Sequence, residues 1–448
     1  MDQLPAPAQL RYYPFQREGI RFILERSGAL LADEPGIGKT IQAIGVINAL
    51  PELEKILIVC PATLRLNWRR ELEKWLVRSR SIGVIGLEQT RSETLLSTCT
   101  IIVINYDRLY ANREALEAIE WDLVILDESH FIKSPGAKRT RVATMLKAKR
   151  RLALSGTPVL NRPAELPPIL SWLSPHEWPR NGWHEYELRY CNAYWDGFGW
   201  DVSGASNLEE LASRLRTVML RRTKAEVLPE LPTKFRTVIE LSPTVAMRAL
   251  VEKEREAFRR VAQQQSDQFR NSIRKLRVDP QQIDGDNLAI IRHQTALAKV
   301  PLVTEFVREA LAGGTTKIVI FAHHRDVIKA LENALAHWHP VILIGGMAMP
   351  ERQCSIDTFQ SDPGCRIFIG NLVAAGTGIT LTASSQVIFA EMSWVPAELS
   401  QAEDRCHRIG TRDSVLVQHL VLAGSVDSIM AKTICKKQKI MDSLLEAQ

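Results

Sequence analysis

The sequence predicts an α/β fold made of two doubly wound parallel sheets with helical insertions between them. Short runs of about four wholly apolar residues recur through the first 160 positions, and each run ends in small or polar residues. A strand buried on both faces of a parallel sheet has this composition. Stretches of helical character separate the runs, and the rhythm returns after position 316. Each sheet is therefore expected to carry its functional groups at the carboxyl ends of its strands.

In the first half of the chain, apolar runs predict buried strands at 29–32, 56–59, 101–104 and 123–126, and a further strand is predicted at 151–154, which begins with Arg151. The runs lead respectively into a glycine-rich loop, Pro61, Asn105-Tyr106-Asp107, Asp127-Glu128 and Ser155-Gly156-Thr157. Because parallel strands present their carboxyl ends at one edge of a sheet, these terminal residues are expected to gather there.

The middle of the chain interrupts this rhythm. Six tryptophans and tyrosines crowd into 183–200, and 244–300 has the pattern of long polar helices. Apolar runs resume at 318–321, 341–344, 367–369 and 387–390. We expect a first domain at 1–228, with a helical and aromatic insertion at about 162–228, and a second at 229–448, with a helical insertion at about 244–300.

Composition narrows the class of protein. The 448 residues are 45% hydrophobic and 24% charged, an ordinary balance for a globular chain. No apolar run approaches the roughly 18 residues of a membrane span, so no membrane association is expected. Seven cysteines without a C-x-x-C pair argue against zinc and against a disulfide framework. A net charge of +6 permits a polyanionic partner without requiring one.

The glycine-rich loop at 33–40 predicts a phosphate-binding site. It follows an apolar run and opens a segment of helical spacing, which is the context that such a loop needs. Its glycines let backbone N–H groups close around phosphate oxygens, and the helix start favours an anion. The alternative is a plain glycine-rich helix entry, since an aspartate stands where the strict pattern has its first glycine. The candidate nucleotide-binding residues are Asp33, Glu34, Gly36, Ile37, Gly38, Lys39 and Thr40.

Two carboxylates and two arginines are the candidate catalytic partners. Asp127 would bind Mg²⁺ together with Thr40, and Glu128 would orient or deprotonate the attacking water. Arg405 and Arg408 are spaced to leave one face of a predicted helix, as a γ-phosphate requires. The alternative for the arginines is a surface helix with ordinary ion pairs, and for Ser155-Gly156-Thr157 a plain turn.

One stretch of the first half is strongly basic. Eight lysines and arginines and no acidic residue lie between Phe131 and Arg151, namely Lys133, Lys138, Arg139, Arg141, Lys147, Lys149, Arg150 and Arg151. The pattern is compatible with a solvated helix face and with a stripe along a phosphate backbone.

The motifs occur in the order found in superfamily-two helicases of the Swi/Snf type, which the chain resembles. They are Phe15-Gln16-x-x-Gly19, ADEPGIGKT, DESH at 127–130, SGTP at 155–158, GTGI at 376–379 and QAEDRCHRIG at 401–410. The segments between them are similar to the annealing-helicase sub-branch (HARP type), most clearly in DESHFIKS, SGTPVLNRPAEL, GWDVSGASNLEEL, MLRRTKAEVL and FAHHRDVI. The resemblance covers nearly the whole chain, as a motor core without accessory domains.

The resemblance implies two RecA-like lobes that bind ATP and Mg²⁺. Gln16 would contact adenine, and lobe two would add Gly378, Arg405 and Arg408 to the nucleotide site. It also implies a monomer that contacts duplex or forked DNA mainly through the backbone, with protein partners unknown. The implied DNA-contact residues are Pro61, Thr63, Asn105, Tyr106, Gly376 and Thr377.

The function implied is a DNA-dependent ATPase that translocates on duplex DNA, with annealing or remodelling of forks and a part in DNA repair. We expect it in the nucleoid of a bacterial or phage-infected cell, or in the nucleus of a eukaryote. The alternatives are a strand-unwinding RNA or DNA helicase and a nucleic-acid-binding scaffold with weak ATPase. The chain departs from the family pattern at Pro35, Val395 and Thr411, which affects lobe coupling rather than chemistry.

Overall fold

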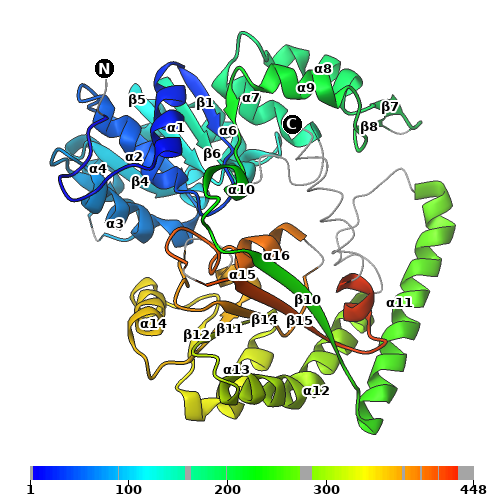
Figure 1. Cartoon of the computed structure of the whole chain (residues 1–448). Coiled ribbons are helices and arrows are strands. Elements are labelled where there is room, and N and C mark those ends of the chain that lie inside the picture. The colour runs from blue at the N-terminus through cyan, green and yellow to red at the C-terminus, as the bar shows by residue number, and fades with distance from the viewer. Residues whose placement is uncertain are drawn as a thin grey trace. The chain divides into compact units, whose positions relative to one another are not determined.

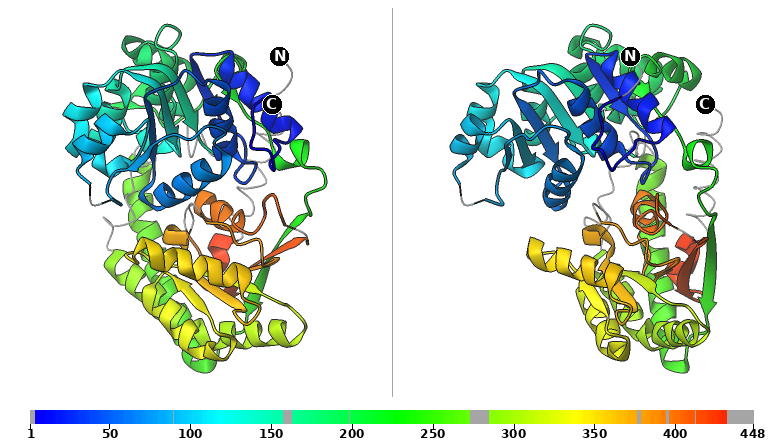
Figure 2. Two further views of the ribbon diagram at one scale, coloured as in Figure 1. Left: turned by 90° about the vertical axis from the view of Figure 1, so that its left-hand side faces the viewer. Right: turned by 60° about the vertical axis from the view of Figure 1, so that its left-hand side comes forward.

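The computed structural model describes residues 4–88, 90–156, 163–197, 199–272, 285–375, 379–393, 396–411 and 413–431. The chain divides into two compact units, Met1–Pro229 and Glu230–Gln448, which are described separately below. Each unit is a wholly parallel main sheet between helices (Figure 1), and Figure 2 shows both units from two further directions. The predicted fold class of two doubly wound parallel sheets is confirmed. No described helix is long and apolar enough to cross a bilayer.

The sheet of unit 1 has the strand order β3-β4-β2-β5-β6-β1-β9. All five predicted strands are present, and two short strands, β3 and β9, join them at the edges. Their bounds are β1 Gly28–Leu31, β2 Ile56–Cys60, β3 Ile82–Val84, β4 Ile101–Asn105, β5 Trp121–Asp127, β6 Ala148–Leu154 and β9 Met219–Leu220. The order places β6 between β1, which leads into the glycine-rich loop, and β5, which ends at Asp127.

Helices cover both faces of this sheet because successive strand residues point to opposite sides. Leu31, Ile58 and Ile125 pack with α1 to α3, whereas Leu30, Val59 and Leu126 pack with α4 to α7. These helices are α1 Pro14–Leu24, α2 Lys39–Ala49, α3 Arg65–Trp75, α4 Ser92–Thr98, α5 Arg113–Glu117, α6 Lys138–Met145 and α7 Pro167–Leu173.

The aromatic segment of unit 1 forms a small subdomain with its own core, built on Trp178, Tyr186 and Tyr190. A short hairpin, β7 Tyr194–Trp195 and β8 Trp200–Asp201, extends from it (Figure 1). Its helices are α8 Trp183–Tyr190 and α9 Leu208–Leu215, and α10 Lys224–Val227 comes later in the chain, after β9. The segment returns to the main sheet through β9, which pairs with β1.

The sheet of unit 2 has the order β10-β15-β14-β11-β13-β12. Four of its strands were predicted, whereas β10 and β15 were not. The strands are β10 Lys234–Leu241, β11 Ile318–Ala322, β12 Val341–Leu343, β13 Ile367–Asn371, β14 Gln386–Phe389 and β15 Val415–Leu422. The helices are α11 Val245–Ser272, α12 Gly285–Ala312, α13 Arg325–Ala334, α14 Met349–Ser361, α15 Leu372–Ala375 and α16 Pro396–Glu403. α12 and α13 pack on one face, α14 and α16 on the other.

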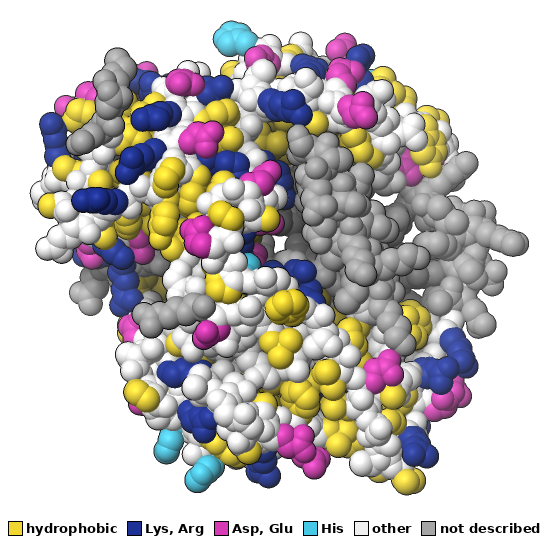
Figure 3. All heavy atoms as spheres, in the orientation of Figure 1, with side chains coloured by type: hydrophobic (Ala, Val, Ile, Leu, Met, Phe, Trp, Pro, Cys, Tyr) yellow, Lys and Arg dark blue, Asp and Glu magenta, His cyan; other side chains and the backbone are white. Residues whose placement is uncertain are grey.

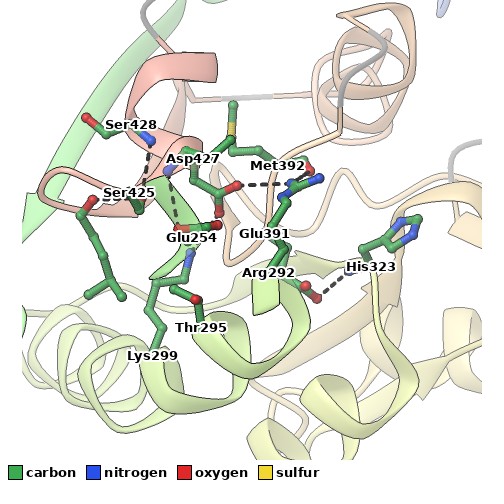
Figure 4. Close-up of polar contacts among 12 residues, drawn as sticks. Glu254, Arg292, Thr295, Lys299, His323, Glu391, Met392, Ser425, Asp427 and Ser428 are labelled. Atoms are coloured by element: carbon green, nitrogen blue, oxygen red, sulfur yellow. Dashed lines mark hydrogen bonds and ion pairs between the residues drawn. The ribbon is translucent and has the colours of Figure 1, made fainter. Parts of the chain in front are cut away.

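A buried polar cluster ties α11 and α12 to the segment after β15 (Figure 4). Arg292 and Lys299 of α12 lie 3.1 and 3.4 Å from the two carboxylate oxygens of Asp427. Glu254 of α11 is 1% exposed and accepts the backbone N–H of Val426. Burial, and after it the nearby Asp427 charge, raises the pKa of Glu254 to about 7.

This raised pKa predicts a loss of stability with rising pH. The folded state holds the Glu254 proton up to about pH 7, whereas the unfolded chain releases it near its ordinary value, so stability falls as pH rises between the two. The full loss would be on the order of 3 kcal/mol. Urea unfolding at a series of pH values should show a shallower fall for Glu254→Gln than for the wild type. An equally steep fall in both proteins would show that Glu254 is not the group responsible.

Candidate functional site

The glycine-rich loop of unit 1 has the backbone of a phosphate-binding turn. Gly36 and Gly38 have φ of 92° and 93°, a left-handed conformation that favours glycine. α2 begins at Lys39 with Gly38 as its N-cap, so unsatisfied N–H groups of the first turn face the loop. Thr40 is the second residue of this helix. The Lys39 ammonium donates to the carbonyls of Asp33 and Glu34, at 2.6 and 3.2 Å.

Gln16 reaches this loop from α1. Its side-chain amide donates to the Ile37 carbonyl at 3.1 Å, and a Cβ added at Gly38 would lie 2.6 Å from the same nitrogen. Its amide oxygen accepts the backbone N–H of Tyr13, whose ring stacks on Phe15. Gln16 therefore lies against the loop, beside a partly exposed aromatic ring.

The acidic residues of the loop are held by residues that sequence reasoning missed. The Asp33 carboxylate is fully buried, and Arg222 donates to both of its oxygens, at 3.1 and 2.7 Å. Gln42 adds a third hydrogen bond to it at 3.2 Å. Glu34 accepts the backbone N–H of Lys224 at 2.6 Å. A contact between Asp33 and a nucleotide would therefore have to come from its backbone.

The Asp127-Glu128 pair lies at the carboxyl end of β5. Burial, and after it the neighbouring Glu128 charge, raises the pKa of Asp127 to about 7. Trp68 donates its indole N–H to the Asp127 carboxylate at 2.8 Å. Glu128 has φ of 49°, which is unfavourable for a residue with a side chain and is found most often at functional sites. One Glu128 oxygen lies 3.5 Å from Nδ1 of His130, and burial lowers the pKa of that histidine.

These groups fit a magnesium ion held by few protein ligands. A divalent cation would favour the charged form of both carboxylates. Across the described part of the chain, no three His, Cys, Asp or Glu side chains converge as a metal cage would require. Mg²⁺ is usually bound by one or two protein groups and takes its remaining ligands from water and phosphate. Asp127 and the Thr40 hydroxyl are the residues of this chain that would hold it.

The turn after β6 packs against the phosphate loop. A Cβ added at Gly156 would lie 2.7 Å from Cγ of Pro35 and 3.4 Å from Nζ of Lys39. Glycine is therefore needed here for close approach of two loops. Thr157 and Pro158 lie outside the described residues.

The expected DNA-contact residues of unit 1 follow two neighbouring strands, β2 and β4. Pro61 and Thr63 border or lie in a short 3₁₀ turn, Ala62–Leu64. Asn105 is buried, and within the described structure its amide oxygen has no hydrogen-bond partner. Tyr106 is also buried, and its hydroxyl donates to the Asp127 carbonyl at 2.8 Å. The Tyr106 side chain therefore packs inside unit 1 against the end of β5, where it is not exposed to DNA.

In unit 2 the arginine segment differs from the prediction in its local structure. α16 ends at Glu403, and tight turns follow, so Arg405 and Arg408 do not lie on one helix face. The Arg405 and Cys406 N–H groups bond to carbonyls three residues earlier, which ends the α-helical pattern. Arg405 is buried, and Arg408 donates to the Thr380 hydroxyl at 2.7 Å. Gly376, Thr377 and Gly378 lie outside the described residues.

Two carboxylates next to these arginines in the sequence, Glu403 and Asp404, form ion pairs with residues of β10. Lys234 lies 3.0 Å from Glu403 and 3.1 Å from Asp404, and Arg236 lies 2.7 Å from Glu403. Burial acts to raise the pKa of Glu403, but Lys234 and Arg236 hold it below its usual value. Glu403 and Asp404 thus anchor the arginine segment to the sheet. The unpredicted strand β10 supplies this anchor.

The basic stretch at 131–151 spans α6, β6 and the residues before and between them. Lys133 and Lys149 pair with Glu165 and Asp122, at 3.2 and 2.8 Å. Arg139 and Arg150 donate to backbone carbonyls. Lys138, Arg141 and Lys147 are exposed. On the face drawn in Figure 3, basic side chains of unit 1 are interspersed with acidic and apolar ones. Four of the eight cations thus have partners within the fold.

Known families match most of the chain. The SNF2-related domain matches residues 15–285, and the helicase conserved C-terminal domain matches residues 299–410. The chain is 34% identical over 461 residues to human DNA annealing helicase and endonuclease ZRANB3, covering 100% of this chain and 42% of that protein.

It is also 34% identical over 450 residues to the SWI/SNF-related matrix-associated actin-dependent regulator of chromatin subfamily A-like protein 1 of Xenopus tropicalis, covering 98% and 46%. The chain thus spans less than half the length of these relatives. Among solved structures, a Sulfolobus solfataricus SWI2/SNF2 ATPase core in complex with dsDNA aligns with a TM-score of 0.48 at 25% identity, covering 99% of this chain and 95% of that one. The two domain matches follow one another along the chain without overlapping. The chain belongs to the SNF2-related family of helicase-like ATPases.

Proposed function

We propose that this chain is a DNA-dependent ATPase that uses ATP and Mg²⁺ to translocate on double-stranded DNA. The observation that carries the proposal is the arrangement at one edge of the unit 1 sheet. There the phosphate-type loop after β1 and the carboxylate pair ending β5 flank the turn after β6, whose Gly156 packs on the loop. The loop would supply a phosphate cradle, and the adjacent residues Asp127 and Glu128 would supply a metal ligand and a base.

Within this site each residue has a distinct role. Lys39 would leave the loop carbonyls and bind the β- and γ-phosphates, and Glu128 would orient the attacking water. Asp127 and Thr40 would hold Mg²⁺, which neutralises developing phosphate charge when bound. Gln16 would contact adenine.

Unit 2 would contribute Gly378 and the two arginines to the same reaction. A guanidinium bonds two phosphate oxygens at once and keeps its charge at any working pH. We propose that Arg405 and Arg408 stabilise the transferring phosphoryl group. The anchoring of their segment by Glu403 and Asp404 to Lys234 and Arg236 supports this role, because it leaves the local acidic groups already paired.

The DNA partner is proposed from the family and from the printed name of the human relative, a DNA annealing helicase. Contacts would come from Pro61, Thr63 and Asn105 in unit 1, and from Gly376 and Thr377 in unit 2, mainly to phosphates. The motor would be a monomer, acting on duplex DNA and on forks that it anneals or remodels. The competing functions are strand unwinding and passive nucleic-acid binding.

Glu128→Gln should separate nucleotide binding from hydrolysis. The amide keeps the size of the side chain and leaves Asp127 for the metal, but it cannot accept the water proton. Phosphate release in the presence of duplex DNA should fall by about 10² to 10⁴-fold, while calorimetric ATP affinity is retained. Lys39→Ala, which removes the phosphate-binding cation, should lose affinity as well. Hydrolysis by Glu128→Gln near the wild-type rate would remove Glu128 from catalysis.

Displacement assays test what hydrolysis accomplishes. A motor that tracks along the phosphates of an intact duplex should remove the third strand of a triplex and leave a tailed duplex paired. ATP-dependent triplex displacement is the expected result, with Glu128→Gln as the inactive control. Unwinding of the tailed duplex at protein concentrations that displace no triplex would make the chain a conventional helicase.

The exposed cations of α6 are a separate test of DNA contact. Lys138→Ala/Arg141→Ala removes two solvent-exposed charges, whereas Lys133→Ala/Lys149→Ala removes two charges already paired with carboxylates. If the α6 pair meets phosphates, the slope of log affinity against log salt should fall by about one for each phosphate that is no longer neutralised. Fluorescence anisotropy with a labelled duplex measures this slope. Equal slopes for both double variants would assign the stretch to a solvated surface.

A further inference from the structure

Trp68 forms an unusual hydrogen bond with the carboxylate at the end of β5. The indole lies in the middle of α3 and is fully buried, and its N–H donates to Oδ2 of Asp127 at 2.8 Å. A buried indole N–H need not donate to a carboxylate. Trp121 is equally buried and donates to a backbone carbonyl, and Trp75 has no partner for its N–H among the described residues.

Two further donors form hydrogen bonds with Asp127. The backbone N–H of Glu128 donates to Oδ1 at 2.9 Å, and the Tyr106 hydroxyl donates to the main-chain oxygen at 2.8 Å. Each carboxylate oxygen therefore accepts one hydrogen bond within the protein. Since a carboxylate oxygen has two lone pairs, one on each remains for another partner. Rotation of the carboxylate about its Cβ–Cγ bond would break both bonds at once.

α3 is itself fixed at both ends. Near its start, Arg65 donates to the Ile85 carbonyl at 2.9 Å. At its end, the Trp75 carbonyl accepts from Asn48 of α2 at 2.8 Å. The ring of Trp75 also stacks on Tyr12, with centroids 5.3 Å apart. The indole of Trp68 therefore projects from a helix that is held at both ends.

We propose that Trp68 is a positioning residue that fixes the Asp127 carboxylate in the orientation that binds the metal ion accompanying ATP. The inference deepens the proposed function and rests on the metal-binding role of Asp127. Partners that orient a metal ligand typically change metal affinity or activity by about 10 to 100-fold when removed. α3 follows directly on the 61–64 segment, so the helix that orients the carboxylate also borders the proposed DNA contact.

The test is made in the Glu128→Gln protein, in which ATP is expected to stay intact during calorimetry. ATP affinity is measured with Mg²⁺ and again with EDTA. The ratio of the two affinities is the gain in ATP affinity that the metal provides. Trp68→Phe removes the N–H and keeps an aromatic ring. It should reduce this gain by about ten-fold while ATP affinity in EDTA is unchanged. Benzothienylalanine at position 68 replaces N–H by sulfur at nearly constant shape, and it should act likewise even where Phe impairs folding.

Trp75→Phe is the matched control, because it removes an indole N–H that has no partner among the described residues. It keeps an aromatic ring against Tyr12 and the backbone carbonyl that accepts from Asn48. It should leave the metal-dependent gain unchanged. An equal gain in the Trp68 and Trp75 variants would overturn the proposal, as would equal losses of affinity with Mg²⁺ and with EDTA, which indicate a general packing role. A Glu128→Gln parent that binds ATP no better with Mg²⁺ than with EDTA would overturn the metal role of Asp127, and this inference with it.

Discussion

The buried ion pair between Arg222 and Asp33 is the interaction on which the glycine-rich loop at 33–40 depends. Arg222 follows β9, almost at the end of unit 1, yet it bonds both oxygens of a carboxylate that directly follows β1. The same guanidinium donates to the Phe15 carbonyl of α1 and to the Gln42 amide of α2. One cation therefore joins α1 and α2 to the residue that follows β1. Loss of one partner of such a buried pair costs about 3 to 5 kcal/mol, because the other charge is left without compensation.

The order of parallel strands brings the remaining site groups to this loop. β6 lies between β1 and β5, so its turn borders both the loop and the carboxylate pair. The strained backbone of Glu128 and the raised pKa of Asp127 are unfavourable in the folded chain itself. Such features persist where the surrounding structure holds them and where a ligand uses them. A bound cation and phosphate would relieve the electrostatic part of this cost, which links stability of the site to its proposed chemistry.

In unit 2, ion pairs connect the segment that carries Arg405 and Arg408 to an edge strand of the sheet. Lys234 and Arg236 of an edge strand neutralise Glu403 and Asp404, so the acidic residues nearest to the two arginines are occupied within the unit. The SNF2-related match at 15–285 extends past unit 1 into unit 2, whereas the helicase C-terminal match at 299–410 lies within unit 2. The chain spans less than half the length of these relatives, so the activities named for the full-length proteins come to this chain only as proposals.

The sequence by itself determined the fold class, the family and the identity of the central strands. The central strands contain short apolar runs, and the loop and carboxylate motifs lie directly at the ends of these runs, so local pattern suffices. It did not reveal β10 or β15, the turn conformation at Arg405, or which cations of the basic stretch have partners within the fold. Those depend on which side chains meet across the fold. Arg222 and Asp33 are 189 residues apart, and Trp68 and Asp127 are 59 apart. Only tertiary structure decides such pairings, because burial makes a hydrogen bond necessary without fixing which residue supplies it.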